Sequence, residues 1–199
     1  MTHTRSLPKL VLATRNTNKA DELKYLLATA SVEILDLSFF PNAPLVDEGT
    51  SSLKENAALK AISAHHHTGY WALGDDTGLC VHALGGDPGV RSARFAGQLT
   101  DAEANRNLIL QLLKDTSDRT ARFVTILALA RPQGLNYFQG QLNGHIAMSS
   151  MSTQGFGYES IFIPDGFNVS LAQITREMKN KISHRSQAAS DLISLISKS

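Results

Sequence analysis

The segment that most limits the possible folds runs from Arg122 to Ala130, because it is the most strongly apolar stretch of the chain. A run of this length and composition predicts a central strand that is buried on both faces of a sheet. Pro132-Gln133-Gly134 follows directly and predicts a turn. Asn143-Gly144 then favours a hairpin between two further strands, at residues 136–142 and 145–148. The later part of the chain is therefore expected to contribute consecutive strands to one sheet.

The first forty residues instead alternate between strand and helix patterns. Residues 9–13 form a compact apolar run, typical of an interior strand, and residues 14–19 are polar. Leu23 and Leu27 follow at helical spacing, and residues 32–37 alternate apolar with polar side chains as in a second strand. Strand and helix alternation followed by consecutive strands predicts an α/β fold with a mixed sheet.

Two adjacent acids, Asp75 and Asp76, stand between glycines and between the apolar residues 70–73 and 79–81. The pattern predicts that both carboxylates lie at the end of a strand. Paired acids beside glycines at a strand end are often ligands of Mg²⁺, which prefers carboxylate oxygens. An ordinary turn rich in Asp is the alternative, and these few residues alone favour it.

Composition narrows the class of protein. The chain has 199 residues, 42% hydrophobic and 19% charged, which predicts a single domain over residues 9–199 after an N-terminal tail of residues 1–8. A net charge of +1, without a cluster of Lys and Arg among aromatics, argues against a nucleic-acid partner. No apolar run approaches the roughly 18 to 20 residues of a membrane span, which argues against a membrane partner. The single cysteine, Cys80, has apolar neighbours and predicts a buried thiol in a reducing, cytoplasmic compartment.

The polar residues 14–19 lie between a predicted strand and a predicted helix. Such a loop offers free backbone N–H groups and the positive end of a helix dipole to an anion, and Lys19 adds a full charge. The loop lacks the glycines that the Walker and dinucleotide patterns require. A surface helix with an ordinary N-cap is the alternative.

Ser52 and Glu55 form a capping-box pattern at the start of an Ala-rich helix. Three acids lie in or before this first turn, namely Asp47, Glu48 and Glu55. One of them is a candidate to share a metal ion with Asp76. The alternative is that Glu55 only caps the helix and that the other two are solvated loop charges.

Two features near the C-terminus indicate a polar or flat ligand. Glycines on both sides of Phe156 allow a flat ligand to approach its ring, although a core aromatic beside a turn is the alternative. Ser183 predicts the N-cap of the last helix. His184 and Arg185 would then carry the wrong sign of charge for a helix N-terminus, which a bound anion or polar ligand would explain.

Taken together, six motifs in order resemble the inosine triphosphate pyrophosphatase family. The resemblance runs from about Lys9 to the C-terminal helix. It implies a long twisted mixed sheet with flanking helices and two lobes around a central cleft. It also implies a Mg²⁺-dependent homodimer that hydrolyses the purine nucleoside triphosphates dITP, ITP and XTP to the monophosphate and pyrophosphate. The motifs are Thr14-Arg15-Asn16-Thr17-Asn18-Lys19, Glu55-Asn56-Ala57, Asp75-Asp76-Thr77-Gly78-Leu79, Gly85-Gly86-Asp87-Pro88-Gly89 with Ser92-Ala93-Arg94, Gly155-Phe156-Gly157-Tyr158, and Ile182-Ser183-His184-Arg185.

The resemblance also implies a role for individual residues. Asp76 would be the catalytic base and a metal ligand, and Asp47 falls where the family usually has a metal-binding Glu. The implied substrate-binding residues are Thr14, Arg15, Asn16, Thr17, Asn18, Lys19, Thr77, Phe156, Gly157, Tyr158, Glu159, Lys179, His184 and Arg185.

The chain departs from the family pattern at three places. Asn18 stands where many members have Gly, Asp47 is one methylene shorter than Glu, and Glu159-Ser160 replaces the common Asp-Pro. Two other functions stay open: a pyrophosphatase for modified pyrimidine or canonical nucleotides, and a non-catalytic nucleotide sensor. The acid pair speaks against the sensor, because a protein that only binds has no need of two costly adjacent carboxylates.

Overall fold

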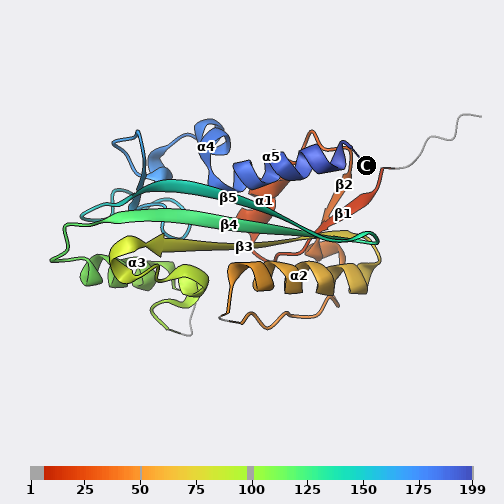
Figure 1. Cartoon of the computed structure of the whole chain (residues 1–199), viewed down its shortest axis with the longest axis horizontal. Helices are drawn as coiled ribbons and strands as arrows, with labels where there is room; N and C mark the ends of the chain where they lie inside the picture. Colours follow the sequence, from red (N-terminus) through yellow and green to blue (C-terminus); the bar gives the residue numbers. More distant parts are fainter. Residues whose placement is uncertain (1–6, 50, 98–100, 199) are drawn as a thin grey trace, which may run out of the picture. The chain divides into compact units, whose positions relative to one another are not determined.

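A computed structural model describes residues 7–49, 51–97 and 101–198. Six strands form one mixed sheet in the order β2-β1-β3-β4-β5-β6, which confirms the predicted α/β class (Figure 1). Residues 1–6 of the predicted tail lie outside the described residues, and the first strand begins at Lys9, as predicted. The strands are β1 (Lys9–Leu12), β2 (Glu33–Asp36), β3 (Trp71–Val81), β4 (Thr120–Arg131), β5 (Gly134–Ile146) and β6 (Phe162–Pro164). The helices are α1 (Thr17–Leu26), α2 (Leu53–Thr68), α3 (Ala102–Leu112), α4 (Arg176–Ile182) and α5 (His184–Ile196), with short 3₁₀ turns η1 (Leu37–Phe39), η2 (His82–Leu84), η3 (Gly89–Arg94) and η4 (Leu171–Gln173).

The predicted hairpin at Asn143-Gly144 is wrong, because both residues lie within the continuous strand β5. Gly144 pairs with Pro164 of the antiparallel strand β6. A Cβ atom on Gly144 would lie 2.2 Å from the carbonyl oxygen of Ile163. The glycine therefore allows a close approach between strands, and the predicted turn at Pro132-Gln133 connects β4 to β5.

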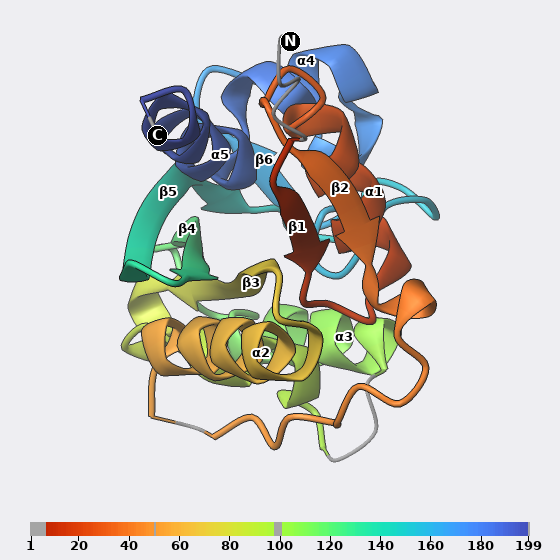
Figure 2. The same ribbon diagram turned by 90° about the vertical axis from the view of Figure 1, so that its right-hand side faces the viewer.

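The chain divides into two compact units, and the first comprises Met1–Asp76, Ile126–Phe138 and Ala188–Ser199. In this unit β1 lies between β2 and β3 and is parallel to both. Helices α1 and α5 cover one face of these strands and α2 covers the other (Figure 2). Leu10 packs with Leu23 and Leu192 on the first face, whereas Val11 packs with Ala64 on the second. The alternation of side chains along β1 thus fills two separate cores.

Strand β3 differs from its prediction in a way that matters for the site. The apolar residues on both sides of the acid pair belong to one strand of 11 residues, so Asp75 and Asp76 lie in its middle and not at its end. Both residues are almost completely buried. Asp76 is the last residue of this part of the first unit, and Thr77 begins the second unit.

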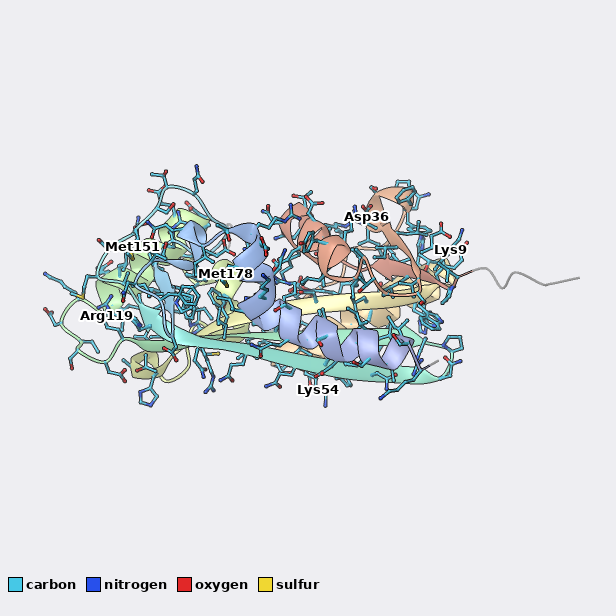
Figure 3. All side chains as sticks on the ribbon, turned by 90° about the horizontal axis from the view of Figure 1, so that it is seen from above. Lys9, Asp36, Lys54, Arg119, Met151 and Met178 are labelled. Atoms are coloured by element: carbon cyan, nitrogen blue, oxygen red, sulfur yellow. The ribbon has the colours of Figure 1, made fainter. Side chains whose placement is uncertain are left out.

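The second unit comprises Thr77–Thr125 and Gln139–Gln187. Arg119, which is labelled in Figure 3, connects elements of this unit. It donates hydrogen bonds to the carbonyls of Leu113, Ile146 and Ala147, at 2.9, 2.7 and 2.7 Å. These bonds join the end of α3 to the end of β5. The core of the unit is formed by Leu79, Val81, Ile109, Leu113, Ala121, Phe123, Ile146, Tyr158, Ile161, Phe162 and Leu171. The single domain predicted over residues 9–199 stays a prediction.

Two predictions from composition can be compared with the structure. Cys80 is half-buried and so is more accessible than predicted, and its burial raises the pKa of the thiol although Arg122 opposes the shift. Within the part of the chain that the structure describes, no helix has the length and apolar character needed to traverse a bilayer.

Candidate active site

Lys19 and Asp75 form a buried ion pair in the first unit. Asn16 caps α1 by accepting a hydrogen bond from the backbone N–H of Lys19 at 3.2 Å, which places the lysine in the first turn of the helix. The Lys19 Nζ atom lies 2.5 Å from Asp75 Oδ1 and 3.4 Å from the Asp75 carbonyl oxygen. The side chain of Asp75 is inaccessible to solvent. A buried carboxylate needs such a partner, because the desolvation of an unpaired charge is costly.

Lys60 connects two further carboxylates. Its Nζ atom lies 2.9 Å from Asp76 Oδ1 and 3.1 Å from Glu48 Oε2. The same ammonium group donates to the carbonyl oxygen of Asp75 at 3.1 Å. Lys19 and Lys60 therefore reach one carbonyl oxygen on β3, and two positive charges meet beside Asp76.

Helix α2 presents this lysine because of its cap and its close contact with β3. Ser52 caps the helix as predicted, and its hydroxyl accepts from the Glu55 N–H at 3.1 Å. Asn56 and Lys60 are four residues apart and so lie on the same face of the helix. Gly74 of β3 allows the approach, since a Cβ atom there would lie 2.0 Å from the Ala57 carbonyl oxygen.

The charge state of Asp76 follows from its surroundings. Burial raises its pKa above the ordinary value, while the charges of Lys60 and Lys19 oppose the shift. Burial alone would lower the pKa of Lys60, but the charges of Asp76 and Glu48 outweigh it and the pKa is raised. Lys60 is therefore a permanent cation, and Asp76 is a carboxylate whose pKa is displaced toward neutrality, as suits a proton acceptor.

Oxygen atoms suited to a hard cation lie around Asp76. Asn56 donates from Nδ2 to Asp76 Oδ2 at 3.3 Å and to the Gly49 carbonyl at 3.1 Å. Its Oδ1 atom is buried and has no hydrogen-bond partner among the described residues. Asp76 and Glu48 share one cation, Lys60, so both carboxylates are within reach of a single positive centre. No group of three or more His, Cys, Asp or Glu side chains suited to a metal occurs in the described residues, but Mg²⁺ is commonly held by one or two carboxylates with phosphate and water.

A second group of polar side chains is buried in the second unit. The Thr77 and Thr125 hydroxyl oxygens are 2.6 Å apart, and Thr125 Oγ1 lies 2.6 Å from His184 Nδ1. Arg185 donates from Nη2 to Thr77 Oγ1 at 3.0 Å. The side chains of Thr125, His184 and Arg185 belong to residues that are at most 5% exposed. Ser183 caps α5 as predicted, accepting from the Ser186 N–H at 3.1 Å.

The glycine-flanked aromatic lies on an exposed turn of the same unit. Phe156 is 42% exposed, and the glycines on its two sides have positive φ angles, 101° at Gly155 and 59° at Gly157. Glu159 shapes the turn by accepting from the Phe156 N–H at 3.1 Å. The same carboxylate forms a very short ion pair with Lys179. The turn thus presents an aromatic ring and a charged pair together.

Comparison with known proteins identifies the family. The model of the Ham1 family matches residues 10–195. The chain belongs to the Ham1 family. A dITP/XTP pyrophosphatase of Christiangramia forsetii is 44% identical over 96% of this chain and 100% of its own length. A HAM1 protein from Coxiella burnetii has a TM-score of 0.87 at 33% identity, covering 97% of this chain and 100% of its own. The Staphylococcus aureus Ham1 protein has a TM-score of 0.86 at 33% identity, covering 96% and 98%. The resemblance predicted from six motifs is confirmed.

Several of the residues predicted to bind the substrate of this Ham1 chain form hydrogen bonds within the protein or lie at its surface. Arg15 donates to the Ala43 carbonyl at 2.7 Å, which anchors the loop before α2. Thr17 and Asn18 are exposed at the start of α1. Tyr158 is buried and its hydroxyl donates to the Ser92 carbonyl at 2.7 Å.

Among the acids Asp47, Glu48 and Glu55, Glu48 is the one that the structure links to Asp76, through their shared ion pairs with Lys60. Asp47 is exposed, and the carboxylate of Glu55 accepts a very short hydrogen bond from the Ser51 hydroxyl. The sequence does not distinguish these three acids, whereas the ion pair with Lys60 distinguishes Glu48.

Three residues of the two polar groups were not predicted from the sequence. In the first unit these are Lys60 and the contact of Asn56 with Asp76, and in the second unit the residue is Thr125. The spacing of Asn56 and Lys60 was a usable signal, because both fall on the face of α2 that carries Ala57 and Ala64. Thr125 gave no signal, since it is one hydroxyl within an apolar strand.

Proposed function

We propose that this Ham1 protein hydrolyses the non-canonical purine nucleoside triphosphates dITP, ITP and XTP to the monophosphate and pyrophosphate. Relatives 43 to 44% identical over at least 90% of this chain are named dITP/XTP pyrophosphatases, which supports the substrate class. The observation that carries the proposal is the meeting of Lys19 and Lys60 at the Asp75 carbonyl, directly beside the carboxylate of Asp76. Two cations and one available base are the groups that hydrolysis of a polyphosphate needs.

The chemistry assigned to these residues is direct hydrolysis. Asp76 accepts a proton from the water that attacks the α-phosphorus, and the bond between that phosphorus and the bridging oxygen of the β-phosphate breaks. Lys19 and Lys60 offset the negative charge on the transferred and leaving groups. The backbone N–H groups at the start of α1 add further donors for phosphate oxygens. No covalent intermediate with the protein is required.

Mg²⁺ fits the residues beside this base. Asp76 and Glu48 would hold it, because their oxygens share a single cationic neighbour in Lys60. Asn56, whose amide nitrogen donates to Asp76, also carries an Oδ1 atom that has no partner among the described residues. When bound, the ion supplies positive charge that offsets the charge of the triphosphate. Phosphate oxygens and water would complete its coordination.

The purine is assigned to the second group of residues. Phe156 offers an exposed ring for stacking, which adds affinity and little discrimination. Donors from His184 and Arg185 would favour a 6-oxo purine. A 6-amino purine would leave such donors unpaired, at a cost of about 1 to 3 kcal/mol per group.

Turnover of dITP in water enriched in ¹⁸O tests the reaction. The wild-type protein with Mg²⁺ is expected to release pyrophosphate and to place the label in dIMP, because the α-phosphorus is attacked. Asp76→Asn should fold normally and lose most of the turnover, while Asp115→Asn, an exposed acid, should match the wild type. Label in pyrophosphate, or full activity of Asp76→Asn, would refute the mechanism.

The same assay separates the other functions. Equal rates with dITP and dATP, or higher rates with pyrimidine nucleotides, would favour a pyrophosphatase of different specificity. Tight binding of dITP without turnover that depends on Mg²⁺ would favour a nucleotide sensor.

A matched pair of variants tests the second metal ligand. Glu48→Gln should raise the Mg²⁺ concentration needed for half-maximal activity about tenfold or more, because a charged ligand becomes neutral. Asp47→Asn removes the neighbouring acid, which is exposed, and should leave that concentration unchanged. The reverse result would return the role to Asp47.

A homodimer located in the cytoplasm completes the proposal. Light scattering of the purified protein measures its mass in solution, and a monomeric mass at micromolar concentration would contradict the dimer.

A further inference from the structure

Thr125 carries a buried hydroxyl that takes no part in the proposed hydrolysis or in the proposed purine contacts. It lies on β4 with no accessible surface. Its oxygen is 2.6 Å from Thr77 Oγ1 on one side and 2.6 Å from His184 Nδ1 on the other. Arg185 donates to the same Thr77 oxygen at 3.0 Å. The four side chains form one continuous row of hydrogen bonds.

Counting protons limits how this row can be arranged. The Thr125 hydroxyl carries one proton, and its partners among the described residues are Thr77 and His184. Because the hydroxyl is fully buried, leaving this proton without an acceptor would be costly. Thr125 must therefore donate either to Thr77 or to His184, and it accepts from the other.

The charge at one end selects the direction. A guanidinium group only donates, so Arg185 gives its proton to Thr77 Oγ1. Hydrogen bonds that run in the same direction polarise and strengthen one another. In that arrangement Thr77 donates to Thr125, and Thr125 donates to His184 Nδ1. The reverse arrangement would point two donors at the oxygen of Thr77 and lose this reinforcement.

We propose that Thr125 is a positioning residue in a relay of hydrogen bonds that run in one direction from Arg185 to His184. Thr125 accepts from Thr77 and donates to Nδ1 of His184, which holds the neutral imidazole with its proton on Nε2. The inference rests on the proposed function, in which His184 and Arg185 recognise the purine. His184 then offers a hydrogen-bond donor, which pairs with the oxygen of a 6-oxo purine and has no acceptor in a 6-amino group. Thr125 contributes to the choice of substrate although it does not touch the base.

The orientation of the ring has a separate cause, which makes the relay testable. The His184 ring lies 5.0 Å from the ring of Phe123, centroid to centroid, at an interplanar angle of 31°. Phe123 in turn packs edge-on against Phe162 at 4.7 Å. Removing the Thr125 hydroxyl leaves this aromatic contact in place, so the ring keeps its location while its tautomer is released.

Two variants and one spectroscopic measurement test the relay. Thr125→Val removes the hydroxyl at nearly constant shape, and Thr125→Ser retains it. Thr125→Val is expected to lower the ratio of kcat/KM for dITP to that for dATP about tenfold, and Thr125→Ser should stay near the wild-type ratio. Long-range ¹H–¹⁵N spectra of the nucleotide-free protein at pH 8, assigned with His184→Asn, should show the His184 proton on Nε2 in the wild type and a mixture of tautomers in Thr125→Val.

Each result decides the relay. A proton on Nδ1 of His184 in the wild type overturns it, as does a Thr125→Val variant with an unchanged ratio and an unchanged tautomer. If Thr125→Val does not fold, the wild-type spectrum and the ratio of Thr125→Ser decide instead. If the wild-type protein does not hydrolyse dITP, the proposed function fails, and the spectrum alone still supports or overturns the hydrogen-bond relay.

Discussion

Gly74→Ala is the substitution through which the packing of α2 against β3 can be measured. A Cβ atom at this position would lie 2.0 Å from the Ala57 carbonyl oxygen, 2.9 Å from the Ala61 nitrogen and 3.0 Å from the Ala57 carbonyl carbon. All three are backbone atoms of α2. No rotation of a side chain relieves the clash, so the helix and the strand must separate until the first contact lengthens from 2.0 Å to about 3.4 Å.

The size of the effect follows from this displacement. Overpacking of a core costs about 1 to 3 kcal/mol, and a contact with helix backbone belongs at the upper end of that range. A loss of about 3 kcal/mol lowers the Tm of a chain of this size by roughly 6 to 12 °C. Asn56 and Lys60 would move with α2 away from Asp76, and a displacement of about 1 Å in a catalytic group costs roughly a hundredfold in rate.

Thermal unfolding and kcat per folded molecule together test this reasoning, with Gly144→Ala as the control. A Cβ atom on Gly144 would lie 2.2 Å from the Ile163 carbonyl oxygen, a backbone clash of similar severity between β5 and β6. Both variants should lose stability, but kcat with dITP should fall much further in Gly74→Ala than in Gly144→Ala. A Gly74→Ala variant with the wild-type Tm, or one that is destabilised but has the kcat of Gly144→Ala, would refute the link between this glycine and Lys60.

Two further predictions concern charge. Lys60→Gln should lower kcat/KM for dITP about a hundredfold, because Glu48 and Asp76 lose the cation between them. The acidic limb of the pH profile should move to higher pH, because the pKa of Asp76 rises when the charge of Lys60 is removed. An acidic limb that does not move would contradict the pairing of Lys60 with Asp76. Asp36, which is labelled in Figure 3, accepts hydrogen bonds from the Lys24 side chain and from Ser38, and these lower its pKa to about 2. A lowered pKa stabilises the folded state above the ordinary Asp value near 4, and the contribution is lost as the pH falls toward about 2. Urea unfolding should therefore show Asp36→Asn less stable than the wild type at pH 7 and nearly equal to it at pH 2.

The fold was predictable where side-chain patterns are local. The apolar run at residues 122–130 gave β4, the alternating residues 32–37 gave β2, and Ser52 marked the start of α2. The failures share a physical cause. Asn143-Gly144 favours a turn when read locally, but the approach of the β6 backbone makes glycine necessary inside a continuous strand. Contacts between segments far apart in sequence decided the conformation there, and local propensity cannot report them.

The candidate site divides in the same way. The motifs located Lys19 and Asp76, and the structure joins them through the carbonyl of the intervening Asp75. The spacing of Lys60 from Asn56 was the one sequence signal for this lysine, and it is weak, because a lysine on an Ala-rich helix resembles an ordinary solvated charge until the helix is packed against the strand. Glu48 could not be told from Asp47 for a related reason. In the sequence, either of these two adjacent loop acids could lie near Asp76, and only the ion pair with Lys60 distinguishes Glu48.

The alternation of side chains along a strand explains why the proposed metal site would need an acid from outside the strand, such as Glu48. Adjacent residues of a strand point to opposite faces, so Asp75 and Asp76 cannot both turn toward one ion. Asp75 faces Lys19 of α1, whereas Asp76 faces Lys60 of α2, and these helices cover opposite faces of the strands (Figure 2). Under the proposed function, the acid pair that first indicated a metal would therefore supply one ligand, Asp76, and one buried partner, Asp75, for the lysine proposed to bind phosphate. A second carboxylate for that ion would have to come from another segment on the α2 face, and Glu48 is the acid that the ion pair with Lys60 brings there.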